Sequence, residues 1–132
     1  MVLFLCESNS ARSPIAEGIF HHLSPSIFVQ SAGLKGSYIR PQVRLVLEER
    51  SVDHGFLRSK DLFGVDLEEV KLAIFLCSAE EAPRLPSRIE QKHWPLPDPL
   101  SSSVKEWEES FRACRDDLWI RITKLVKTIE SQ

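Results

Sequence analysis

The sequence lacks long hydrophobic runs, is poor in glycine and carries no excess of charge of one sign. No apolar stretch approaches the roughly 18 residues of a membrane-spanning helix, so we expect no transmembrane segment. The 17 Lys and Arg against 19 Asp and Glu leave a formal charge of −2. This balance gives no overall field that would favour nucleic acid or an anionic membrane as a partner. With 42% hydrophobic residues and only 5 glycines among 132 residues, the composition is that of a globular protein.

Cysteine is also scarce, and its three positions are far apart: Cys6, Cys77 and Cys114. An odd, widely spaced set is neither a disulfide framework nor a zinc site, which would need paired spacings. The apolar start, residues 1–6, is too short for a signal peptide and follows no basic residue. We therefore expect a cytoplasmic protein whose thiols are structural, catalytic or redox-active.

Short apolar runs alternate with segments of helical spacing, which predicts an α/β fold. The expected strands are residues 2–5, 27–29 and 72–76, with a short edge strand near 93–94. Helices are expected after Pro14 and Pro41, between 63 and 70, and from 104 to 129. We interpret residues 1–132 as a single domain with a short, doubly wound, mostly parallel sheet and helices on both faces. Ligands of such sheets bind at the carboxyl ends of strands, where Cys6 and Cys77 both lie.

The segment from Cys6 to Ser13, called the oxyanion loop below, carries the clearest chemistry. A tight loop between a strand and a helix aims backbone N–H groups inward, and the helix N-terminus adds positive charge. Arg12 supplies a fork of donors that fits two oxygens of a tetrahedral oxyanion. The same field favours the thiolate of Cys6, with the Ser13 hydroxyl as a further donor, and Asn9 suits a left-handed turn. The expected binding residues are Glu7, Ser8, Asn9, Ser10, Ala11, Arg12 and Ser13. The alternative is a buried structural cysteine with a solvated arginine.

Residues 6–18 resemble the active-site loop of the low-molecular-weight protein tyrosine phosphatase superfamily, which includes the thioredoxin-coupled arsenate reductases. Ser31-Ala32-Gly33, the turn 59–62 and Asp98-Pro99 resemble further motifs of that superfamily, so the likeness covers nearly the whole chain. The resemblance implies that Cys6 is the nucleophile, that Arg12 binds the oxyanion and that Asp98 is the general acid.

Two further stretches resemble the arsenate reductases. Leu76-Cys77-Ser78 matches the strand end that carries a redox cysteine, and His93-Trp94 with the C-terminal third is similar as well. The resemblance then implies a Cys6–Cys77 disulfide step on arsenate, with thioredoxin or a small thiol as reductant. The chain departs from the family's pattern at three places. It has Ser8 where the family's loop has glycine, and Ala11 where that loop has a second cysteine. It has Ala82-Pro83 in the region where the reductases carry a third redox cysteine.

Two other functions remain open from the sequence. One is a phosphatase that hydrolyses phosphate monoesters through a cysteinyl-phosphate, with Cys6, Arg12 and Asp98 but without Cys77. The other is an anion or redox sensor whose catalysis is impaired by Glu7 and Ser8. No cofactor is required in any of these hypotheses. Asn9, Glu17, Ser31 and Asp61 match positions where some reductases bind potassium, although they could equally brace the loop by hydrogen bonds. Cys114 lies on the apolar stripe of the last helix, and we expect it in the core.

Overall fold

The sheet has four strands, all parallel, in the order β2-β1-β3-β4. The computed structural model describes all residues from 1 to 132. Its strands are β1 (Val2–Cys6), β2 (Val29–Gly33), β3 (Leu72–Phe75) and β4 (Glu90–His93). The predicted mostly parallel α/β fold is therefore confirmed. The second strand begins at Val29 rather than residue 27, and Phe28 before it is 84% exposed.

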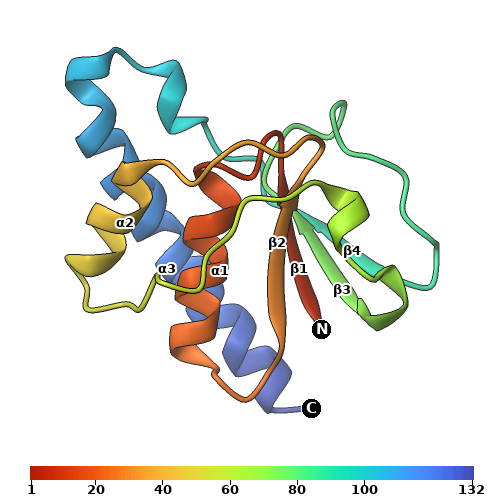
Figure 1. Ribbon diagram of the computed structural model, residues 1–132. Coiled ribbons are helices and arrows are strands. Elements are labelled where there is room, and N and C mark those ends of the chain that lie inside the picture. The colour runs from red at the N-terminus through yellow and green to blue at the C-terminus, as the bar shows by residue number, and fades with distance from the viewer.

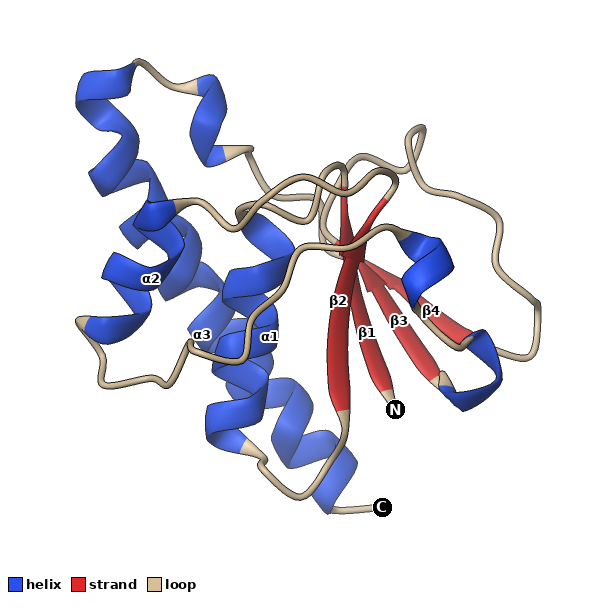
Figure 2. Ribbon diagram, viewed as in Figure 1, coloured by secondary structure: helices blue, strands red, loops and turns tan.

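All three α-helices lie on one face of the sheet (Figures 1 and 2). They are α1 (Arg12–Leu23), α2 (Pro41–Glu48) and α3 (Trp107–Glu130). Helices were predicted on both faces. The other face carries no α-helix but two single 3₁₀ turns, Leu62–Gly64 and Leu67–Glu69. The side chains of Asp61 and Asp66 each cap one turn, and so the acidic stretch folds as two short turns instead of one helix.

Alternation along β1 divides the core between these two layers. Val2, Phe4 and Cys6 belong to the large cluster under the helices, while Leu3 and Leu5 belong to a smaller cluster under the 3₁₀ turns. The large cluster is completed by the apolar stripe of α3, which includes Phe111, Cys114, Leu118 and Ile122. No helix combines the length and the hydropathy that crossing a membrane would need.

The strand order puts the topological switch point of the sheet at the carboxyl end of β1. The strand order reverses there, since the chain moves to β2 on one side and later to β3 on the other. In open α/β sheets this switch point is where a ligand crevice forms. Cys6 ends β1 at this point, and the loop that follows crosses the edge of the sheet beside the end of β2 (Figure 1).

Gly33, the last residue of β2, is packed directly against that loop. Its register partner is Cys6, and its N–H donates to the carbonyl of Lys60 at 2.9 Å. A Cβ atom at this position would lie 2.6 Å from the Lys35 carbonyl oxygen and 2.7 Å from the backbone nitrogen of Asn9. Because these contacts are backbone atoms, they cannot be relieved by a side-chain rotation.

We expect Gly33→Ala to lower the free energy of unfolding by about 1–3 kcal/mol, the usual cost of forcing extra volume into a packed site. Urea unfolding measures the change. Gly36→Ala is the matched control, since its nearest atom would be 3.5 Å away and little change is expected. Equal stability of the two variants would contradict this account of Gly33.

Candidate active site

The oxyanion loop is almost wholly buried and begins at the carboxyl end of β1. Asn9, Ser10, Arg12 and Ser13 are at most 7% exposed. Asn9 has φ 51°, which is the left-handed conformation expected from the sequence. Glu7 is exposed on the rim, so its carboxylate is not buried against the thiol. Most of the loop is thus buried in the protein, and its only acidic side chain, Glu7, is exposed to solvent.

Hydrogen bonds order the hydroxyl next to the Cys6 thiol. The Asn9 side-chain amide donates to Ser13 Oγ at 2.8 Å, and Ser13 Oγ lies 2.9 Å from Cys6 Sγ. Since the serine oxygen already accepts from Asn9, its own proton is free to be donated to the sulfur. The Ser13 hydroxyl is therefore placed to donate a hydrogen bond to the Cys6 sulfur.

Arg12 is the first residue of α1 and joins three parts of the edge of the sheet. Its Nη1 donates to the carbonyls of Leu76 at 3.2 Å and Leu96 at 3.1 Å. Its Nη2 lies 3.9 Å from Asp98 Oδ2. The guanidinium therefore holds the segments that end in Cys77 and Asp98 beside the loop that carries Cys6.

The amino end of α1 is open to an anion. Its N-cap is Ala11, which offers no side chain to the free N–H groups of the first turn. These N–H groups and the partial positive charge of the helix end act on the same loop as Arg12. The position can therefore bind a tetrahedral oxyanion in front of Cys6.

Asp98 is held at the start of the acid loop, residues 96–103. Its Oδ1 accepts from the Leu100 N–H at 3.0 Å and caps the 3₁₀ turn Pro99–Ser101, while the side chain stays 38% exposed. Oδ2 is thus the oxygen that faces Arg12. A partly exposed carboxyl directed at an oxyanion site can deliver a proton to a leaving oxygen.

Cys77 lies just beyond the end of β3 and is fully buried. Leu5 pairs with Phe75, so Cys77 is one residue past the position opposite Cys6, and strand spacings of about 4.8 Å and 3.3 Å put their Cα atoms about 6 Å apart. That separation lies within the range of disulfides, about 4.4–6.8 Å. Leu76 shares the core cluster of Cys6, while Cys77 belongs to neither core cluster. Burial raises the pKa of the Cys77 thiol, with the charge of Arg12 acting against it.

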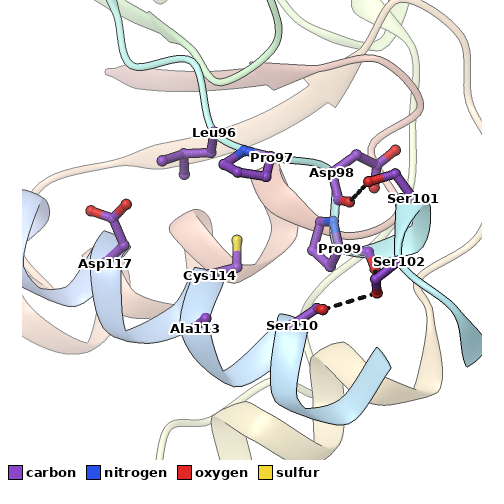
Figure 3. Close-up of a pocket in the computed structure, with 10 residues that line it drawn as sticks. All are labelled: Leu96, Pro97, Asp98, Pro99, Ser101, Ser102, Ser110, Ala113, Cys114 and Asp117. Atoms are coloured by element: carbon purple, nitrogen blue, oxygen red, sulfur yellow. Dashed lines mark hydrogen bonds between the residues drawn. The ribbon is translucent and has the colours of Figure 1, made fainter. Parts of the chain in front are cut away.

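Cys114 is placed differently from the other two thiols. It lies on α3 in a cavity of about 270 Å³ that is also lined by Asp98, Ser110 and Asp117 (Figure 3). Burial raises its pKa to about 12, which leaves it a neutral and poorly nucleophilic thiol. The sequence predicted its place in the core but not its position behind the acid loop, because helical spacing identifies a face and not what covers it.

Three of the four residues predicted as a potassium site, Asn9, Glu17 and Ser31, form a hydrogen-bonded brace. Asn9 donates to Ser31 Oγ at 2.9 Å, Ser31 donates to Glu17, and Asn9 Oδ1 accepts from the Lys60 N–H at 2.8 Å. Asp61 uses Oδ1 to cap a 3₁₀ turn. The structure also contains no cluster of His, Cys, Asp and Glu that could hold a metal.

Glu17 should make the stability of the fold depend on pH. Burial raises its pKa above the usual 4.5, so the folded protein loses stability as pH rises through that raised pKa. Glu17→Gln removes this loss, and the variant's stability relative to the native protein should increase between pH 4.5 and 8. Urea unfolding at several pH values tests this. A difference that stays constant, or that shrinks with pH, would contradict it.

Comparison with known proteins agrees with this geometry. The family model described as low molecular weight phosphotyrosine protein phosphatase matches residues 1–132. An arsenate reductase from Shouchella clausii is 31% identical over 98% of this chain and 97% of its own. The crystal structure of an arsenate reductase from Archaeoglobus fulgidus superposes with a TM-score of 0.82 at 26% identity, covering 96% of this chain and 99% of the other. An arsenate reductase in the phosphate binding state gives the same TM-score at 29% identity, over 97% of both chains.

The match runs from the first residue to the last, and the thiol, the guanidinium and the carboxyl lie at one edge of the sheet. The chain belongs to the low-molecular-weight phosphotyrosine protein phosphatase family, whose members similar to it include arsenate reductases.

Proposed function

We propose that this protein is an arsenate reductase that uses Cys6 as nucleophile and Cys77 as the second thiol. The observation that carries the proposal is the position of Cys77, about one residue beyond the partner of Cys6 on the neighbouring strand. Arg12 supports it, because its two carbonyl contacts fasten both Cys77 and Asp98 to the oxyanion loop. The full-length similarity to arsenate reductases supports the same substrate.

In the first step, the Cys6 thiolate attacks the As(V) atom of arsenate. The loop N–H groups and Arg12 hold the arsenate oxygens, whose negative charge they balance. A sulfur–arsenic bond forms while an arsenic–oxygen bond breaks. Asp98 gives its proton to the departing oxygen, which leaves as water.

In the second step, the thiolate of Cys77 attacks the sulfur of Cys6. A sulfur–sulfur bond forms, the sulfur–arsenic bond breaks, and its electron pair stays on arsenic, which becomes As(III) and leaves as arsenite. The two thiols thereby supply both electrons and end as a disulfide. Cys77 is fully buried and makes no disulfide at rest, so we propose that the exposed segment 78–81 moves for this step.

The disulfide must then be reduced by a thiol from outside the chain. The position that would carry a third redox cysteine is Ala82, and the remaining thiol, Cys114, is buried on α3. We propose thioredoxin or a small thiol as the reductant, acting directly on the Cys6–Cys77 bond. A reaction that consumes reducing equivalents in this way suits a cytoplasmic enzyme.

One observation favours hydrolysis of phosphate monoesters as a second candidate. A cysteinyl-phosphate needs only a nucleophile, an anion-binding group and an acid, for which we propose Cys6, Arg12 and Asp98, and the full burial of Cys77 is consistent with its taking no part. Phosphate and arsenate are nearly equal in shape and charge, so the same loop binds both. The two functions differ in whether Cys77 takes part.

The variant Cys77→Ser separates these functions. We expect it to abolish arsenate reduction with thioredoxin, or to make it wholly dependent on an added small thiol, and to spare hydrolysis of p-nitrophenyl phosphate. Mass spectrometry after one turnover should find a Cys6–Cys77 bond in the native protein. Cys114→Ser is the matched control and should retain both activities, whereas Cys6→Ser should lose both.

Undiminished arsenate reduction by Cys77→Ser, with no Cys6–Cys77 bond in the native protein, would refute the reductase and leave the phosphatase. Loss of arsenate reduction in Cys114→Ser as well would show that the buried thiol of α3 takes part.

Asp98→Asn tests the general acid. An asparagine keeps the cap on the Leu100 N–H but cannot donate the carboxyl proton. We expect turnover to fall about 10²–10³-fold while oxyanion affinity stays nearly the same, since a general acid acts mainly on the transition state. Steady-state kinetics and calorimetric titration with phosphate measure the two quantities. An unchanged rate would reduce Asp98 to a turn residue.

A further inference from the structure

Arg40 is attached to the outside of the oxyanion loop although neither the motif nor the mechanism includes it. It ends the segment 34–40, which links β2 to α2, and its backbone N–H donates to the carbonyl of Ser10 at 3.0 Å. This segment and the acid loop both run from the carboxyl edge of the sheet toward the helices (Figure 1). The backbone of Arg40 is therefore in direct contact with the loop in which we propose that an oxyanion binds.

The guanidinium of Arg40 has no anionic partner within the protein. It stacks over the ring of Tyr38 at 4.6 Å from the centroid, and its Nη1 donates to the Tyr38 hydroxyl at 2.6 Å. No carboxylate lies within 4.0 Å, and its Nε is buried without any hydrogen-bond partner. The ring of Tyr38 fixes the plane of the guanidinium but leaves its charge uncompensated.

The other arginines of the chain are satisfied in one of three ways. Six lie within 4.0 Å of a carboxylate: Arg12, Arg50, Arg88, Arg112, Arg115 and Arg121. Arg44 and Arg58 donate to backbone carbonyls, and Arg84 is exposed to water. Arg40 alone is partly buried, has no anionic or carbonyl partner and keeps a donor unpaired. The charge of its guanidinium is not balanced within the protein, and an anionic ligand beside the outer nitrogens would balance it.

We propose that Arg40 is a second anion-binding residue of this site, and that it selects ligands carrying a further anionic group beside the oxyanion held by Arg12. Arg40 offers a planar fork of donors to that group, and a carboxylate fits such a fork well. The proposal rests on the oxyanion site of the proposed function but not on either reaction. Arsenate itself carries no second group, and so Arg40 would act on esters and their analogues.

Calorimetry with two non-hydrolysable probes, phenylphosphonate and 4-carboxyphenylphosphonate, tests this without any turnover. The native protein should bind the carboxylated probe about tenfold more tightly, as expected for one charge-assisted hydrogen bond. Arg40→Gln should lose this preference and bind phenylphosphonate with an affinity close to the native value. Lys35→Gln is the matched control, because it removes the same charge from an exposed position of the same segment and should keep the preference.

Each other result has a distinct meaning. If the native protein binds both probes equally, Arg40 has no such role. If Arg40→Gln and Lys35→Gln lose the preference to the same extent, general charge and not Arg40 is responsible, and the proposal is overturned. If neither probe binds, the oxyanion site fails, and the proposed function fails with it.

Discussion

The contacts of Arg12 are the constraint on which the rest of the site depends. Arg12 is only 7% exposed, so its guanidinium needs partners within the protein, and these are the carbonyls of Leu76 and Leu96 and the carboxylate of Asp98. These partners come from segments far apart in the chain. Burial of one charge therefore gathers the thiol, the acid and the second cysteine at one edge of the sheet.

The same contacts fix the backbone that leads into Cys77. The Leu76 carbonyl accepts from Arg12 and also from the Leu96 N–H at 3.1 Å, so the backbone before Cys77 is fixed. The segment after it is exposed and free of the sheet. Cys77 thus lies between a backbone held by hydrogen bonds and an exposed segment that makes none to the sheet.

The oxyanion loop also owes its shape to polar groups buried behind it. Asn9 uses its amide to connect Ser13 with Ser31, and Ser31 leads on to Glu17. The chain of hydrogen bonds sets the direction of the Ser13 proton toward Cys6. It also keeps a carboxyl in the interior whose pKa is raised by burial, which is the cost in stability of a rigid loop.

The sequence by itself determined the local features: the buried strands, the helices after the prolines, the left-handed turn at Asn9 and the loop from Cys6 to Ser13. Each of these follows from neighbouring residues, through hydrophobic periodicity, ring geometry or φ preference. Only the tertiary structure decided which face the helices cover and that Asn9, Ser31 and Glu17 are joined by hydrogen bonds. It also decided that Cys114 and Asp98 line one cavity and that Arg40 has no counter-ion. These properties depend on distances between segments that are remote in the chain, and no local pattern records such distances.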